Sequence, residues 1–280
     1  MRSLGTSLRL HWPEYLIEAW GLGTFMVLTG AVVTLLEYSG SPFHALVADP
    51  QLRRVIVGLA VGVTLILLVY SPWGRQSGAH FNPAVTLAFF RLGKVAPWDA
   101  VCYSIAQLLG GIAGVLLIAF ILGPRFTEPP VQYITTVPGA GGELAAFSIE
   151  LAMTFVLMGM VLLVSNTPRL AWLTGLFSGC LVCVYIFVAG PISGMSLNPA
   201  RTLSSALPAE QWIGFWIYLT APPIGMVAAA EAYRRLLPTR PAQCAKLIHD
   251  PGKRCIHCGH EPGRELEPTS QLTRREKSHA

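Results

Sequence analysis

SGAHFNPAVTL, at residues 77–87, returns as SGMSLNPARTL at residues 193–203, and seven of the eleven positions are identical. Each copy follows two long apolar segments, and the first segment of each pair begins beside a lone glutamate, Glu18 or Glu150. Such self-similarity along one chain marks an internal repeat. The chain is therefore built from two related halves.

Each Asn-Pro-Ala motif is expected to begin a short helix. Asparagine is a favoured N-cap, and proline suits the first helical turn because its missing N–H needs no partner there. The apolar run after each motif is only six residues long, too short to cross a bilayer alone. One copy by itself would fit an ordinary turn between helices. Two matched copies instead favour half-helices whose N-termini meet at mid-membrane, where irregular backbone has to line a cavity.

The composition around the repeats suits lipid, because charged residues make up 12% of the chain and hydrophobic residues 52%. Six charge-free segments are long enough to span a bilayer: 19–36, 55–74, 100–124, 151–168, 170–200 and 211–230. Three spans separate the two motifs, so the motifs enter from opposite sides as inverted repeats. The sequence therefore predicts an all-α membrane protein with six transmembrane helices and two re-entrant half-helices.

The net charge of +5 is explained by topology rather than by a nucleic-acid partner. With the amino terminus inside, 16 of the 20 Lys and Arg residues fall on the cytoplasmic side. The four outer ones are Arg53, Arg54, Arg125 and Arg201. This bias follows the positive-inside rule and predicts that both termini are cytoplasmic. The first apolar segment lacks a cleavage site of small residues, so we expect no signal peptide.

Residues 78–86 and 190–201 are similar to the pore loops of the major intrinsic protein family, the aquaporins and glycerol channels. The resemblance covers residues 14–235. It implies the aquaporin fold, a homotetramer with one pore per subunit, and a passive channel in the bilayer for water and small neutral solutes rather than an enzyme. It assigns the pore motifs to Asn82, Pro83, Ala84, Asn198, Pro199 and Ala200.

Elementary electrostatics supports such a pore. Helix N-termini carry partial positive charge and unpaired N–H donors, which repel cations. The side chains of Asn82 and Asn198 would orient a passing oxygen, so that water passes and protons do not. Arg201 is the sole charge between Leu170 and Glu210, and a charge near the membrane interior is a functional candidate by default. We expect it at the outer constriction rather than in an ion pair.

The resemblance places the remaining constriction residues at Gly62, Ile186 and Met195, which predicts a wide and partly apolar pore. Such a ring resembles the nodulin-like and glycerol-conducting branches, which pass glycerol, urea or neutral metalloid acids. Thr202 replaces an aspartate common in glycerol channels, and Phe215–Trp216 matches the water-selective pattern. A strictly water-selective channel therefore stays an alternative.

Three further residues are expected to support the loops. Glu18 and Glu150 occupy matched places, which favours acceptors for backbone N–H groups of the loop in their own half over the proton-coupling site of a carrier. His80 abuts the first motif, where it is a hydrogen-bonding wall residue or a gate. A structural role with a fixed tautomer is favoured for it.

The composition changes beyond Arg235 to proline, cysteine, histidine and charge, which is typical of a disordered tail. We expect a cytoplasmic N-terminal tail at 1–13, a channel domain at 14–235 with halves at about 14–122 and 143–235, and a cytoplasmic tail at 236–280. The tail holds six residues of metal-ligating type within seventeen positions: Cys244, His249, Cys255, His257, Cys258 and His260. The spacing Cys-x-x-Cys suits zinc, and reduced thiols in a flexible tail are the alternative.

No nucleotide-binding loop or nucleophile motif occurs in the chain, so an enzyme or pump is disfavoured. Apart from the zinc candidate, no cofactor is expected. A cell membrane, such as a bacterial inner membrane, is the expected location, since no targeting element is found.

Overall fold

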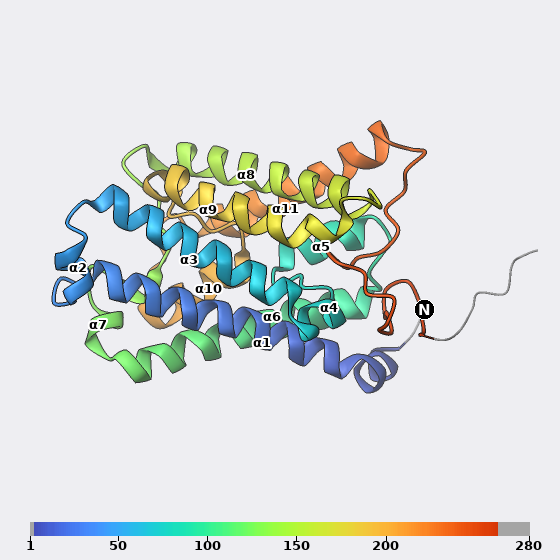
Figure 1. Ribbon diagram of the computed structural model, residues 1–280, viewed down its shortest axis with the longest axis horizontal. Helices are drawn as coiled ribbons and strands as arrows, with labels where there is room; N and C mark the ends of the chain where they lie inside the picture. Colours follow the sequence, from blue (N-terminus) through green and yellow to red (C-terminus); the bar gives the residue numbers. More distant parts are fainter. Residues whose placement is uncertain (1–2, 263–280) are drawn as a thin grey trace, which may run out of the picture.

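The computed structural model describes residues 3–262, which form helices and loops without a strand (Figure 1). Six long helices lie side by side: α1 (Leu4–Glu37), α3 (Pro50–Tyr70), α6 (Pro97–Leu122), α8 (Gly142–Ser165), α9 (Thr174–Ser193) and α11 (Phe215–Leu236). Within the described residues, five of these are long and apolar enough to cross a membrane. The sixth, α11, is as long, but Pro222, Pro223 and Glu231 make it less apolar.

Two shorter helices begin at the repeated motifs, as the sequence predicts. They are α5 (Pro83–Arg91) and α10 (Pro199–Ala209), and both lie inside the bundle. The loops hold the small helices α2 (Pro42–Leu46), α4 (Pro72–Ser77), α7 (Pro124–Thr127), η1 (Gln132–Ile134) and η2 (Ala171–Leu173). Figure 1 places α2 and α7 at one end of the bundle and α4 at the other. The predicted fold of six long helices with two half-helices is confirmed.

Equivalent helix pairs of the two halves pack through glycine. A Cβ atom on Gly23 of α1 would lie 2.8 Å from the carbonyl oxygen of Gly110 on α6. In the second half, a Cβ atom on Gly225 of α11 would lie 2.5 Å from the carbonyl oxygen of Leu151 on α8. Helices in lipid associate by close packing, for which only small residues leave room. The repeat thus extends from the motifs to the helix contacts that frame them.

The prediction of a separate N-terminal tail at 1–13 is wrong for its described part, because α1 already begins at Leu4. The Ser3 side chain caps this helix by accepting from the backbone N–H of Thr6 (3.3 Å). Asp99 of α6 holds the first part of α1, because its carboxylate lies 2.8 Å from the His11 ring and accepts a hydrogen bond from the Tyr15 hydroxyl (2.6 Å). A search for charge-free segments stops at the first acid and so misses acids that are buried and paired.

The prediction of a mostly disordered C-terminal tail is wrong for residues 237–262. Ala245 is fully buried, and Lys246 and Cys255 are 2% and 3% exposed. This segment folds back over the α4 end of the bundle (Figure 1). Its composition gives no sign of this order because the buried surface is supplied by the helices beneath it. The rest of the predicted tail, 263–280, lies outside the described residues.

Candidate functional site

The two asparagines cap the half-helices. The Oδ1 atom of Asn82 accepts from the backbone N–H of Ala84 (2.8 Å), and Pro83 occupies the first turn of α5. In the same way, Oδ1 of Asn198 accepts from the N–H of Ala200 (3.0 Å) at the start of α10. Both side chains are thereby fixed by the backbone that follows them.

The asparagines also join the two motifs to each other. Asn82 Nδ2 donates to the carbonyl oxygen of Leu197 (2.9 Å), and Asn198 Nδ2 donates to the carbonyl oxygen of Phe81 (2.8 Å). The half-helices therefore meet by their N-termini. Each amide group has two N–H bonds, so each asparagine keeps a second N–H for a molecule in the cavity beside it.

The first loop is held by Glu18, which is fully buried. One carboxylate oxygen accepts from Ser77 Oγ (2.7 Å) and from the N–H of His80 (3.1 Å). The other accepts from the N–H of Phe81 (2.6 Å) and from Gln107 Nε2 (2.8 Å). Four donors thus pair with one carboxylate inside the bundle.

The second loop is held by Glu150, which is also fully buried. It accepts from Ser193 Oγ (2.7 Å) and from the N–H groups of Ser196 and Leu197 (2.8 Å each). Neither acid lines the cavity described below. The structure places both carboxylates against the loop of their own half.

Sequence reasoning missed a matched pair of tyrosines. The Tyr103 hydroxyl donates to the carbonyl oxygen of Ser77 (2.9 Å), and the Tyr218 hydroxyl donates to that of Ser193 (2.6 Å). These carbonyls end α4 and α9, where the helix itself supplies no donor. The two tyrosines follow the motif asparagines by 21 and 20 positions. These nearly equal offsets are a signal in the repeat that could have revealed them.

A cavity of ≈ 330 Å³ passes between the asparagines. Its wall is mostly aliphatic where α3 and α9 face it, with Val57 and Val61 on one helix and Val182 and Ile186 beside Ser178 on the other. Toward the α7 end the lining includes Pro130, Val131, Ile134, Met195 and Arg201. Toward the α4 end it includes His80, Val85 and Leu247 of the tail. The arrangement is a largely apolar passage with polar groups at the motifs and at the two ends.

The prediction that Gly62 lines the constriction is wrong. A Cβ atom there would lie 2.6 Å from the carbonyl oxygen of Gly179, so Gly62 is in contact with α9 instead. Its neighbour Val61 lines the cavity, as do Ile186 and Met195. An offset counted from Asn82 runs through the α4 loop. One residue of difference in that loop turns a helical position by about 100°, which moves it from one face to another.

Arg201 lies at the cavity with 9% of its surface exposed. Its backbone N–H donates to Asn198 Oδ1 (3.3 Å), which fixes the start of the side chain. Among the described residues, its Nη1 atom has no hydrogen-bond partner and no carboxylate forms an ion pair with it. A buried guanidinium nitrogen without a protein partner is available to a polar molecule in the passage.

The residues that left the solute open lie away from the cavity. Thr202 Oγ1 is within hydrogen-bond distance of Thr136 Oγ1 (2.8 Å) and Ser196 Oγ (2.5 Å). Trp216 is half exposed on the surface of α11, and its Nε1 atom donates to Glu143 (2.9 Å). These contacts support a loop and a helix end, and neither Thr202 nor Trp216 lines the cavity.

His80 connects the first motif to the tail. Its Nε2 atom donates to the carbonyl oxygen of Ala245 (2.7 Å), and its Nδ1 atom lies 3.0 Å from Thr86 Oγ1. The ring is stacked between Phe89 and His257, with centroid distances of 5.2 and 5.6 Å. The predicted wall residue is therefore held on both nitrogens and both faces.

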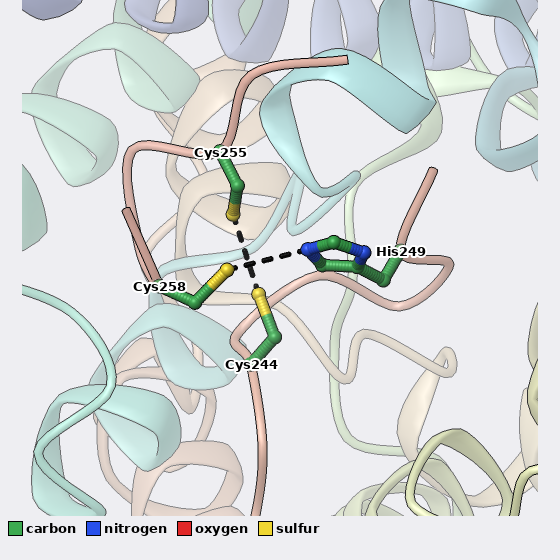
Figure 2. A group of neighbouring side chains, drawn as sticks. All are labelled: Cys244, His249, Cys255 and Cys258. Carbon is green, nitrogen blue, oxygen red and sulfur yellow. Dashed lines mark hydrogen bonds between the residues drawn. The ribbon is translucent and has the colours of Figure 1, made fainter. Parts of the chain in front are cut away.

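The structure brings four of the six predicted metal ligands together. The ligand atoms of Cys244, His249, Cys255 and Cys258 all lie within 4.8 Å of one another, and Figure 2 shows the side chains turned toward a common centre.

The other two histidines point elsewhere. His257 Nε2 donates to the carbonyl oxygen of Ser77 (3.2 Å), and His260 Nε2 to that of Pro251 (2.8 Å). Burial lowers the pKa of His257 to about 4, so its ring is neutral at pH 7.

Comparisons with known proteins agree with this geometry. Residues 9–233 match the sequence model of the family described as Major intrinsic protein. Aquaporin NIP1-3 of Oryza sativa subsp. japonica is 40% identical over 174 residues, which cover 61% of this chain and 58% of that protein. Nodulin-26 of Glycine max is 38% identical over 218 residues, which cover 78% of this chain and 76% of that protein. For the rice protein and two similar relatives, the match spans 58–64% of the relative's length.

A solved structure shares the fold. It is the aquaglyceroporin from Plasmodium falciparum, with a TM-score of 0.67 and 23% sequence identity, and the match covers 81% of this chain and 96% of that one.

Proposed function

Because this chain belongs to the major intrinsic protein family, we propose that it is a passive membrane channel for water and small uncharged solutes such as glycerol. One observation carries the proposal. The asparagines of two opposed half-helices and the unpaired Nη1 of Arg201 face a single apolar passage. A passage of this kind performs no reaction, and it excludes ions by the charge and the few polar groups that line it.

Transport would proceed by exchange of hydrogen bonds along the passage. A solute oxygen accepts from Arg201 at one end and then from the free N–H groups of Asn82 and Asn198 at the centre. The N-termini of α5 and α10 direct their positive ends toward this point, which raises the energy of a cation there. A water molecule that accepts from both asparagines cannot at the same time relay a proton, so the file is interrupted.

The solute range follows from the wall. Val61, Ile186 and Met195 offer aliphatic surface beside Arg201, which suits a carbon backbone as well as water. The relatives named nodulin-26 and aquaglyceroporin support this breadth. We therefore include glycerol, urea and neutral metalloid acids among the solutes, with a strictly water-selective channel as the alternative outcome.

A proton-coupled carrier is disfavoured by the surroundings of its two candidate acids. Glu18 and Glu150 accept four and three hydrogen bonds and do not line the cavity. A coupling site has to exchange protons with the transport path, which these carboxylates do not reach.

The proposal extends to topology and assembly. We propose that the protein lies in a cell membrane, with a channel domain at 14–235 and both termini in the cytoplasm. Contacts support one side for both ends of the chain, because Arg254 of the tail pairs with Glu14 of α1 (3.0 Å) and Asp250 with Arg75 of α4 (3.3 Å). The homotetramer is proposed from the family resemblance, and the mass of the detergent-solubilised protein tests it.

Flux into proteoliposomes tests the channel. Light scattering after an osmotic step should show faster water and glycerol equilibration than in empty vesicles, without saturation and without dependence on a proton gradient. A metal chelator is included in one arm because the Cys/His tail contacts His80 at one end of the cavity. Saturable or proton-dependent transport would contradict the channel, and water flux without glycerol flux would leave the water-selective alternative.

A further inference from the structure

We propose that Cys244, His249, Cys255 and Cys258 bind one zinc ion, and that this zinc site holds the tail in the end of the passage near α4 and closes it. The proposal has two parts, a metal site and a closure, and different contacts carry each. The closure rests on the proposed channel, whereas the metal site does not.

The four side chains suit zinc in chemistry and in spacing. Three thiolates and one imidazole form a closed structural set for Zn²⁺. With bonds of about 2.3 Å to sulfur and 2.0–2.1 Å to nitrogen, a tetrahedral ion places its ligand atoms roughly 3.5–3.8 Å apart. The Cys244 and Cys255 Sγ atoms are 3.4 Å apart, and His249 Nε2 is 3.2 Å from Cys258 Sγ (Figure 2). Both of these pairs would move slightly apart to accommodate the ion.

The backbone around the ligands forms a tight turn. The N–H of Cys255 donates to the carbonyl oxygen of His260 (2.8 Å), and the N–H of Gly259 donates to that of Cys255 (3.0 Å). Gly259 has φ = +76°, which glycine adopts without strain. Both sulfur atoms of the Cys-x-x-Cys pair are thereby presented on one side.

A buried positive charge lies beside the zinc site and is a separate observation. Lys246 is 2% exposed, and its Nζ atom donates to the carbonyl oxygen of Arg254 (3.0 Å). A buried ammonium needs a nearby negative group. Three thiolates and Zn²⁺ give a net charge of −1, which supplies one.

The zinc site positions Leu247 at the end of the passage. Leu247 is 6% exposed and lines the cavity, together with residues of α3, α5 and the first motif. Its N–H donates to the carbonyl oxygen of Gly78 (3.1 Å), while Ala245 accepts from His80 (2.7 Å). An apolar side chain held in this way displaces water from the mouth.

Contacts around the mouth fix the segment on several elements. Gln243 donates to Asn166 after α8 (2.8 Å), and Arg254 donates to both carboxylate oxygens of Glu14 on α1 (3.1 and 3.0 Å). Lys253 donates to the carbonyl oxygen of Pro72 at α4. The tail thus bridges α1, α4, the first motif and the loop after α8. Because a metal site of this kind contributes folding free energy, loss of zinc should release these contacts together.

The test measures zinc content and water flux on the full chain, purified under reducing conditions and reconstituted. We expect about one zinc per chain, and a several-fold rise in water flux when a chelator removes it.

Cys255→Ser with Cys258→Ser should lose zinc and be open without chelator. Leu247→Ala should keep zinc and still show raised flux, which separates closure from metal binding and from misfolding. The matched control is Cys180→Ser with Cys183→Ser, a second Cys-x-x-Cys pair on α9.

Four results would overturn the inference. Zinc below a tenth of an equivalent, unchanged in the Cys255/Cys258 variant, removes the metal site. A Cys244–Cys255 disulfide in the reduced preparation does the same. Stoichiometric zinc with equal flux before and after chelation removes the closure alone. No flux in any state or variant removes the closure and the channel proposal together.

Discussion

The two halves of the molecule hold their loops in the same way but differ at the two ends of the passage. A buried glutamate, a serine and a tyrosine recur around each loop, as Glu18, Ser77 and Tyr103 in the first half and as Glu150, Ser193 and Tyr218 in the second. The shared contacts fix the asparagines at the centre. What repeats is therefore the scaffold that keeps two irregular loops inside a membrane.

The differences lie where each half faces an end. Three positions after its asparagine, the second half has Arg201 where the first has Val85, and both line the cavity. The first loop instead receives the tail, through Ala245 and Leu247. The proposed selection by charge and the proposed closure by the tail therefore lie at opposite ends, and the centre between them is the same in both halves.

Removing the scaffold acids should have the largest effect and should be unequal between the halves. Glu18→Ala leaves four donors unpaired and Glu150→Ala leaves three, at about 1–3 kcal/mol for each buried donor. We expect both variants to lose flux, and Glu18→Ala to unfold at the lower temperature in detergent. Thermal unfolding followed by circular dichroism measures this.

The matched control for the acids is Glu128→Ala, because Glu128 lies exposed in the loop after α7. It should unfold like the parent protein. Wild-type stability in either acid variant would contradict the scaffold role.

Arg201→Val makes the second half resemble the first and should affect ions rather than water. A local potential of several kT corresponds to roughly a hundredfold change in cation entry. Proton leak into vesicles, followed with a pH-sensitive dye, should rise by about that factor while water flux persists. The control is Arg125→Val, which removes an outer charge that does not line the cavity. Unchanged exclusion of protons would show that the half-helix N-termini suffice.

Val61→Trp tests which face of α3 belongs to the passage. A large ring at this position should reduce glycerol flux by about tenfold or more and water flux less, since the smaller molecule needs less width. Gly62→Trp is the matched neighbour. It should impair folding, because its Cβ atom already meets the Gly179 carbonyl. Selective loss of glycerol flux in Gly62→Trp, with normal stability, would restore the original prediction.

The sequence predicts the architecture well because the repeat, the spans and the N-caps are local patterns. Asn82 and Asn198 can be predicted as N-caps from the prolines that follow them alone. Gly62 shows the limit of this reasoning. Its predicted role depends on counting back from Asn82, and that count passes through the α4 loop. A difference of one residue in the loop leaves the predicted position on the right helix but turns it to another face.

The tail marks a second limit. Its composition predicts disorder for an isolated chain, yet Ala245 and Leu247 are buried against the channel. Cysteine and histidine spacing identifies six candidate ligands and cannot choose among them, because the choice of Cys244, His249, Cys255 and Cys258 depends on how the segment turns in space. His257 is diverted by contacts with Ser77 and Tyr103 that lie far away in the sequence.

The smallest expected effect is a difference in stability between equivalent variants of the two halves, and it arises from one hydrogen bond. Tyr218→Phe leaves the Ser193 carbonyl without a donor among the described residues, at about 1–3 kcal/mol. Tyr103→Phe should cost about 1 kcal/mol less, because His257 of the tail also donates to the Ser77 carbonyl (3.2 Å).

Denaturant or thermal unfolding of the zinc-loaded protein measures the difference between the two tyrosine variants, and chelation should abolish it by releasing His257 from Ser77. A difference that persists after chelation would place its origin within the halves themselves. Equal costs in the loaded protein would mean that the tail does not stabilise the first loop. The comparison therefore detects docking of the tail by stability alone, whether or not any solute passes.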